Sequence, residues 1–514
     1  MTFAELSFSV SVSMNRLLFW ILAASALGFR PLPCAGADGI PLAQRRWFET
    51  RTAHFNVYSC GPAQAVNQVA GQLEEFCEAY SQLAGVQAVA SPPIVVMAFP
   101  DHRTMKPFLP LYHGQPENLA GFFQRSSDEN LIVLSLPEPG AVSAGMAVVF
   151  HEYAHLLFRR NDRVWPLWLK EGMAEIYSTF ETTGQRALIA QPIEHHLQLL
   201  KREPLMPLSE LFAVTPDSPQ YNERERQGIF YAESWLLTHF LMAGDNAGYR
   251  SRFGNYTALL REGQSPVQAF TNALQTTLPA MEAELRRYLA RDRFEPVQLN
   301  FPENVTAAKP FVTRSLTPVE VCFHLGDELF RIDRLDDAEK NFTDAQKLAP
   351  GSPLPYEGFG LLAVRREQTD PALREFKEAL QRGSTSYRVY YFDAWLKFRL
   401  PAKAAGEIHD ELLKSILLMP WFSPSHELFG ILELAQGNLS LATQHLQLAV
   451  QLEPENSYYL LALADAQMRS SDITAARRTL TALLLPTVEA KLRARAEELF
   501  RQINGQNQPS AAGQ

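Results

Sequence analysis

Cysteine is rare in this chain of 514 residues, which contains only four. Removal of an N-terminal signal segment, described below, leaves Cys60, Cys77 and Cys322, which are too few for a disulfide scaffold or for a cysteine-based zinc site. Cys60 ends a strand-like run at 54–58, and Cys77 lies in an amphipathic helical segment at 63–83. In an exported protein these two cysteines either form a bridge or remain buried free thiols, and the sequence leaves both open.

An excess of positive charge is also absent. The chain has 47 Lys and Arg against 56 Asp and Glu, which gives a formal net charge of −9. Proteins that bind nucleic acid usually carry a basic surface, so no nucleic-acid partner is expected. The hydrophobic content of 46% and the charged content of 20% are those of an ordinary globular protein, and the length favours two or three domains.

Long apolar runs are missing beyond the N-terminus. The run at 17–27 is too short to span a bilayer, which needs about 20 residues. It follows Arg16 and precedes three small residues at 35–37 that suit a signal-peptidase site. We therefore expect residues 1–37 to be a signal peptide that directs the protein to the periplasm or the extracellular space. An uncleaved membrane anchor is the alternative, and no membrane span is expected after removal of the signal.

The segment at 148–157 carries the motif HExxH in an apolar run with helical spacing. Positions i and i+4 of a helix lie on one face, so His151 and His155 can point two imidazoles at one metal ion. Glu152 lies beside them and can reach a metal-activated water without being a ligand. This is the arrangement that zinc-dependent hydrolysis requires. The alternative is a core helix with two hydrogen-bonded histidines.

A second helical segment at 168–177 follows and reads WLKEGMAEIY. A helix here places Glu171 and Glu175 on one face, one turn apart. A catalytic zinc site keeps three protein ligands, and a carboxylate from a second helix can be the third. The other carboxylate then orients a ligand histidine. The alternative for this pair is a solvated helix face.

Together the two segments resemble the gluzincin zinc metallopeptidases, and the short gap between them is similar to that of the bacterial peptidase MA-like domains. The resemblance implies one Zn²⁺ per chain, held by His151, His155 and Glu171. It implies that Glu152 is the general base and that Glu175 supports the ligands from a second shell. The expected activity is hydrolysis of peptide bonds in a peptide or protein substrate.

The resemblance also implies an α+β catalytic domain with a small sheet ahead of the HExxH helix. Strand-like runs at 54–58 and 94–99, and a hairpin formed by 120–123 and 131–134, agree with this expectation. In gluzincins an edge strand of the sheet pairs with the extended substrate. The expected substrate-binding residues are on the first hairpin strand: Ala120, Gly121 and Phe122.

Gluzincins also supply a Tyr or His from a later helix to stabilise the oxyanion of the tetrahedral intermediate. The apolar helical segment at 231–241 offers Tyr231 and His239, and we prefer Tyr231. Each of them can instead be a polar residue of a core helix. His195 and His196 lie in a polar helical segment and are expected at the surface.

The last third of the chain repeats small and aromatic residues with a period of 34. This register resembles tetratricopeptide repeats over 319–502 and implies an all-α solenoid that binds a protein partner. One degenerate unit interrupts the pattern, and the last unit is partial. The register positions are Gly326, Ala338, Phe342, Ala345, Gly360, Ala372, Phe376, Ala379, Gly430, Ala442, Leu446, Ala449, Ala476 and Leu480.

The sequence thus predicts a catalytic domain at 45–295, a proline-containing linker at 296–318, the repeats, and a disordered tail at 503–514. The predicted function is that of an exported zinc peptidase whose repeats bind a protein partner. The alternative is a peptidase-like fold without catalysis that acts as a repeat-based binding scaffold.

Overall fold

The computed structural model describes residues 42–505 with several gaps. The gaps are 85–93, 113–114, 117–118, 125, 127–128, 137–143, 162–164, 184–185, 223, 245–246, 292, 302–310, 401–404 and 486–487. The predicted signal peptide and most of the predicted tail lie outside the described residues. The last described helix, α23, spans Ala490–Gly505, so residues 503–505, which the sequence assigns to the tail, are helical. None of the described helices is long and apolar enough to cross a membrane.

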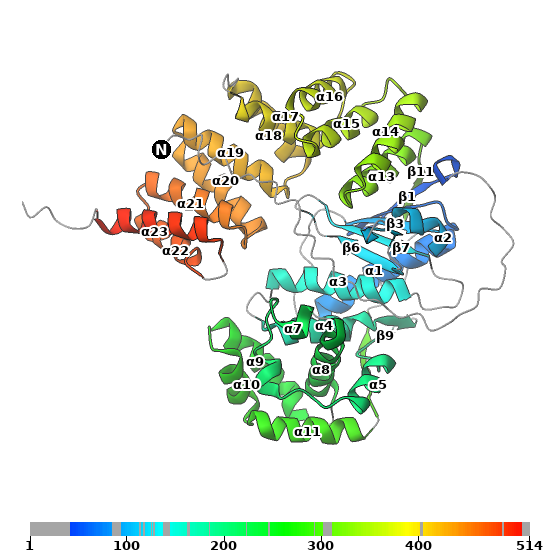
Figure 1. Ribbon diagram of the computed structural model, residues 1–514, viewed down its shortest axis with the longest axis vertical. Coiled ribbons are helices and arrows are strands. Elements are labelled where there is room, and N and C mark those ends of the chain that lie inside the picture. Colours follow the sequence, from blue (N-terminus) through cyan, green and yellow to red (C-terminus); the bar gives the residue numbers. More distant parts are fainter. Residues whose placement is uncertain are drawn as a thin grey trace, which may run out of the picture.

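A six-stranded sheet forms the centre of the N-terminal part (Figure 1), and four of its strands coincide with the predicted apolar runs. The strand order is β11-β1-β2-β3-β7-β6, with β2, β3 and β7 parallel and the other pairs antiparallel. The predicted hairpin is confirmed, because β6 pairs with β7 in antiparallel orientation. Strand β6 is also an edge strand, since it has no further partner among the described strands. The strands are β1 (Phe48–Arg51), β2 (Phe55–Ser59), β3 (Ile94–Phe99), β6 (Gly121–Gln124), β7 (Leu131–Ser135) and β11 (Val312–Ser315).

Both faces of the sheet are buried at its central strands, which explains why β3 is apolar throughout rather than alternating. Val96 and Ala98 belong to one hydrophobic core, together with helices α1 (Ala63–Ala84) and α3 (Ala144–Asn161). The alternate residues Met97 and Phe99 face the other way and belong to a second core. That second core continues into the C-terminal helices, which lie over the opposite face of the sheet in Figure 1.

A helical unit follows α3 and packs below it in Figure 1. Its central helix is α8, which packs against α4, α5, α7, α9 and α11. A three-stranded sheet of order β10-β9-β8 lies beside it. The elements are α4 (Leu167–Ser178), β8 (Glu181–Thr183), β9 (Arg186–Ile189), α5 (Glu194–Arg202), α6 (Leu208–Leu211), α7 (Pro219–Asn222), α8 (Arg224–Ala243), α9 (Ala247–Arg261), α10 (Pro266–Leu274) and α11 (Leu278–Ala290).

The segment predicted as a linker, 296–318, contributes one strand to each of the two sheets. Its first strand, β10 (Val297–Asn300), pairs with β9, and its second strand, β11, pairs with β1 and extends the main sheet. The side chain of Arg314 on β11 also reaches the buried carboxylate of Glu49 at 2.5 Å. The linker therefore ties the C-terminal helices to both sheets.

The C-terminal helices form consecutive antiparallel pairs that follow one another in an arc beginning over the main sheet (Figure 1). The predicted register is confirmed by their packing. A Cβ atom added to Gly326 would lie 2.6 Å from the ring of Phe342, and one added to Gly360 would lie 2.3 Å from Phe376. The helices are α13 (Pro318–Arg331), α14 (Leu335–Leu348), α15 (Leu354–Arg365), α16 (Thr369–Gln381), α17 (Tyr387–Arg399), α18 (Ala405–Leu418), α19 (Ser423–Gln436), α20 (Leu439–Leu452), α21 (Ser457–Arg469) and α22 (Ile473–Ala482).

The turns between paired helices follow the same period. Asp333 and Glu367, which are 34 residues apart, both adopt positive φ values, as do Gly437 and Ser471. The degenerate unit predicted from the sequence is the pair α17 and α18, which is helical and well packed although its register residues differ. The turn conformation thus repeats within the regular units, at 333 and 367 and again at 437 and 471.

The helix spacing at Gly360 gives a first testable prediction. Gly360→Ala adds a methyl group against Phe376, and the overpacking should outweigh the higher helix propensity of Ala by about 1–2 kcal/mol. Urea unfolding measures this loss. Gly351→Ala is the matched control, because an added Cβ there meets no atom within 4 Å, and its stability should stay within about 0.5 kcal/mol of wild type. Equal effects of the two substitutions would contradict the packing argument.

Helix α13 packs on the domain that contains the main sheet, which we call the sheet domain. Polar contacts hold it there, in addition to the second hydrophobic core that the two share. Arg331 on α13 donates to the backbone and side chain of Glu129, at 3.2 and 3.0 Å. The same guanidinium lies 2.9 Å from Asp327, which also binds Arg388 of α17 at 2.6 Å. The two arginines hold the pKa of Asp327 well below its usual value, against the effect of burial, which raises it. The repeats and the sheet domain are therefore joined by a charged interface.

Cys60, Cys77 and Cys322 are all free thiols, so of the two alternatives for Cys60 and Cys77 the structure shows the unbridged one. Cys77 contacts the hydroxyl of Tyr153 at 3.1 Å.

Candidate metal centre

Helices α3 and α4 position the predicted metal ligands. Helix α3 carries His151, Glu152 and His155, and α4 carries Glu171. Helix α4 approaches α8 closely at Gly172, where an added Cβ would lie 2.2 Å from Thr238. This close packing sets the position of α4 along α8, and with it the position of Glu171 relative to α3.

The three predicted ligand residues converge on one point. The Nε2 atoms of His151 and His155 are 3.2 Å apart, and Glu171 Oε2 lies 3.2 Å from His155 Nε2 and 3.5 Å from His151 Nε2. A tetrahedral zinc with bonds of 2.0–2.1 Å separates its nitrogen and oxygen ligands by about 3.3–3.4 Å. The three donor atoms thus already form one face of such a tetrahedron, and the residues fit a zinc ion.

Burial and charge in this cluster also suit a cation. Burial lowers the pKa of His151, but a hydrogen bond to Glu171 and the nearby carboxylates of Glu175 and Glu152 outweigh it and raise the pKa to about 9. Burial raises the pKa of Glu171, yet His155 and His151 hold it well below its usual value. The site therefore stabilises positive charge next to an ionised carboxylate. His155 is the more exposed of the two histidines, which marks the open side.

Two supporting contacts surround the ligands. Glu175 Oε1 lies 3.5 Å from His151 Nδ1, long for a hydrogen bond but in the position expected of a carboxylate that orients a ligand histidine. Glu175 Oε2 lies 3.3 Å from His196 Nε2 on α5. The prediction that His196 is at the surface is wrong, because this residue is buried, whereas His195 is exposed. Helix α5 turns one face inward, and His196 lies on that face.

Tyr221 on α7 was not predicted from the sequence. Its hydroxyl donates to Glu171 Oε1 at 2.9 Å, the carboxylate oxygen that does not face the two histidines. The contact fixes the orientation of the carboxylate and leaves Oε2 facing the two histidines. No sequence motif marks this tyrosine, which lies 50 residues after its partner.

Removing this contact gives a second testable prediction. Tyr221→Phe leaves a buried carboxylate oxygen without its donor, so zinc affinity should fall about 10–100-fold, as is typical when a group that supports a metal ligand is lost. Competition with a chelator measures the affinity. Tyr256→Phe, the same substitution in the core beside Trp168, is the control and should leave affinity unchanged. An unchanged affinity in Tyr221→Phe would remove Tyr221 from the site.

The two candidates for oxyanion stabilisation differ in position. Tyr231 on α8 is buried, with its ring 6.3 Å from that of His151 and stacked on Tyr221. His239 has both nitrogens engaged elsewhere, since Nε2 donates to the Ala190 carbonyl and Nδ1 accepts from a tyrosine hydroxyl. Burial lowers its pKa to about 4. Tyr231 is thus the candidate near the metal centre, and its catalytic role stays a prediction.

The predicted substrate strand lies at the sheet edge beside α3. Gly121 begins β6, and an added Cβ there would lie 3.0 Å from the Val133 carbonyl and 3.5 Å from Gly145 on α3. Ala120 directly precedes the strand, and Phe122 is half-buried within it. The position agrees with a strand that lines a cleft, while substrate binding by Ala120, Gly121 and Phe122 stays a prediction.

No protein-family model matches this chain, and no curated protein matches it. Several solved structures do. YrrB, a TPR protein with an unusual peptide-binding site, is 16% identical and aligns over 35% of this chain and 91% of its own, with a TM-score of 0.30. TTC0263, a thermophilic TPR protein of Thermus thermophilus, is 19% identical over 36% of this chain and 99% of its own, with a TM-score of 0.28.

The pilus biogenesis factor PilW is 18% identical over 37% of this chain and 92% of its own, with a TM-score of 0.31. The repeat architecture of this chain follows from the packing of its helix pairs. The similarities do not bear on the metal centre.

Proposed function

We propose that the chain combines a helical-repeat scaffold for a protein partner with a zinc-dependent hydrolase centre that cleaves peptide bonds. The observation that carries the hydrolase component is the convergence of two imidazole nitrogens and one carboxylate oxygen at mutual distances of 3.2–3.5 Å. The repeat component is supported by the register of the helix pairs and by their charged junction with the sheet domain.

Zinc, when bound, polarises a carbonyl group and lowers the pKa of water. The other roles belong to side chains of this chain. Glu152 follows His151 on α3 and is half-buried. In this proposal it takes a proton from the attacking water and delivers it to the leaving amine. Tyr221 and Glu175 hold the ligands in position, and we assign to Tyr231, whose ring lies 6.3 Å from that of His151, the donation to the developing oxyanion.

A protein-binding scaffold without catalysis is the second candidate. The number of regular helix pairs favours it, since they account for most of the chain after residue 318. In that case the metal centre would be structural or vestigial, and the repeats alone would carry the function.

Zinc content tests the metal centre directly. The full chain without its signal should retain zinc bound by His151, His155 and Glu171, and His155→Ala should lose it, because two protein ligands hold zinc much less tightly than three. Elemental analysis after exhaustive dialysis measures the difference. His195→Ala, which removes an exposed histidine, is the control and should keep the wild-type zinc content. A His155→Ala variant with undiminished zinc would rule out this ligand set.

Hydrolysis is then tested with a peptide library. The hydrolase proposal expects zinc-dependent cleavage that chelation abolishes and zinc restores. If the protein holds zinc at this centre and cleaves no peptide, the scaffold without catalysis is the better account.

A further inference from the structure

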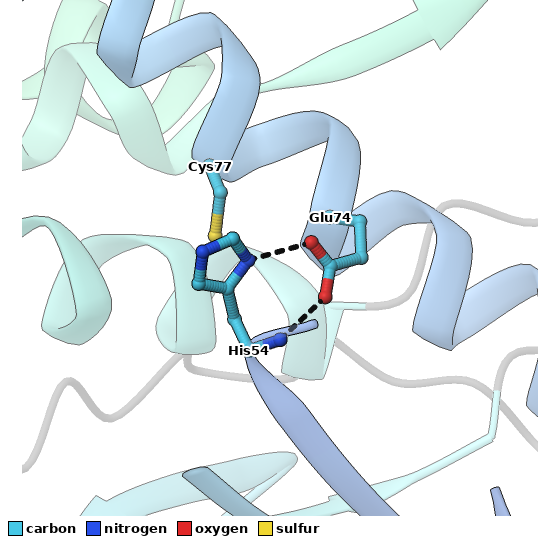
Figure 2. A group of neighbouring side chains, drawn as sticks. All are labelled: His54, Glu74 and Cys77. Carbon is cyan, nitrogen blue, oxygen red and sulfur yellow. Dashed lines mark hydrogen bonds and ion pairs between the residues drawn. The ribbon is translucent and has the colours of Figure 1, made fainter. Parts of the chain in front are cut away.

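A second cluster of metal-ligand side chains lies away from this centre, on the far side of α3. His54 directly precedes β2, and Glu74 and Cys77 lie on α1, three residues apart and therefore on one helix face. Figure 2 shows the His54 ring between the other two side chains. One potential ligand atom from each residue lies within 4.8 Å of the other two.

The cluster is held in place before any ion binds. Glu74 accepts the backbone N–H of His54 at 2.8 Å, and its second oxygen lies 2.7 Å from His54 Nδ1 (Figure 2). Cys77 Sγ contacts the hydroxyl of Tyr153 on α3, the helix that carries the HExxH motif. Three elements that are distant in sequence therefore meet at this point: the start of β2, α1 and α3.

The types of ligand atom in this cluster and their exposure suit a metal site better than they suit a simple buried ion pair. The His54 and Glu74 side chains are 27% and 21% exposed, whereas Cys77 is buried. An ion can thus enter from one side and still be held by a thiolate from the core. Imidazole, thiolate and carboxylate together match the preference of zinc, which binds sulfur at about 2.3 Å and nitrogen at about 2.0–2.1 Å.

We propose that His54, Glu74 and Cys77 form a second zinc site, separate from the HExxH centre, that ties α1 to the start of β2. Tetrahedral zinc separates a sulfur and a nitrogen ligand by about 3.5 Å. The ligand atoms now lie within 4.8 Å of one another, so the longest separation has to shorten by up to about 1.3 Å when the ion binds. Solvent completes the coordination, and the thiol proton of Cys77 is released to water when the ion binds.

Cobalt substitution distinguishes this site from the HExxH centre. A thiolate ligand gives Co²⁺ an intense near-ultraviolet charge-transfer band, and the HExxH centre contains no cysteine. The full chain titrated with Co²⁺ should show this band, which Cys77→Ser should abolish. His155→Ala should keep it, so a failure of the second site can be told apart from a failure of the hydrolase centre.

Two further variants make the test complete. Cys322→Ser, which replaces a buried thiol on α13, is the matched control and should keep the full band. His54→Gln should weaken cobalt binding at least tenfold while leaving every cysteine in place, which covers the case in which Cys77→Ser does not fold. Absence of the band in the full chain, or its persistence in Cys77→Ser, would overturn the proposal. Unchanged cobalt affinity in His54→Gln would do the same.

Discussion

Glu152→Gln is expected to keep its zinc and its fold and to lose about 10²–10⁴-fold in hydrolytic rate, the range typical for loss of a general base. Glutamine has nearly the same size as glutamate but cannot accept the proton from the attacking water. The three ligand residues are unchanged, so zinc content should not fall. Glutamine is also a fair helix former, so α3 should remain stable.

Three measurements on one preparation decide the role of Glu152: zinc content, thermal melting and the rate of peptide cleavage. Glu262→Gln, the same substitution at an exposed position just after α9, is the control and should cleave at the wild-type rate. A Glu152→Gln protein with normal zinc and near wild-type turnover would remove this carboxylate from the mechanism.

The second large effect is expected from truncation. A chain that ends at Asn300 lacks β11, which pairs with β1, and α13, which covers one face of the main sheet. The lost side chains that complete this core are Leu316, Val321, Leu325 and Leu329. Each fully buried apolar side chain contributes about 1.5–3 kcal/mol, so their sum is comparable with the whole stability of a typical domain, about 5–15 kcal/mol.

The truncated chain should therefore fail to unfold cooperatively and should expose apolar surface, detectable by dye binding and by loss of zinc. A chain that ends at Gln381 retains β11 and the first two helix pairs, and it should keep both its melting transition and its zinc. If the shorter chain instead melts like the longer one and holds zinc, the sheet domain is independent of the repeats. Residues 296–318 would then act as the simple linker that the sequence predicts.

The sequence predicted those features that depend on residues close together along the chain. HExxH and EGxAE each lie within one helix, so spacing alone predicts which side chains share a face, and the structure brings His151, His155 and Glu171 together. The repeat register was predicted for the same reason, because the small and aromatic residues recur every 34 positions.

Contacts between distant segments carried no such signal. Strand β11 has four residues, all exposed, and none of the alternation that identifies a strand, yet it pairs with β1 across more than 260 residues. Tyr221 and His196 reach the metal centre from α7 and α5, and nothing in their own neighbourhoods marks them. The burial of both sheet faces was missed because it depends on α13, which the sequence assigns to another domain.

The central claim is that zinc is held between α3 and α4. A crystal structure of the zinc-loaded full chain, with anomalous data collected on both sides of the zinc absorption edge, tests it most directly. The account predicts an anomalous peak about 2.0–2.1 Å from His151 Nε2, His155 Nε2 and Glu171 Oε2. A zinc-loaded crystal with no peak between these three atoms would contradict it.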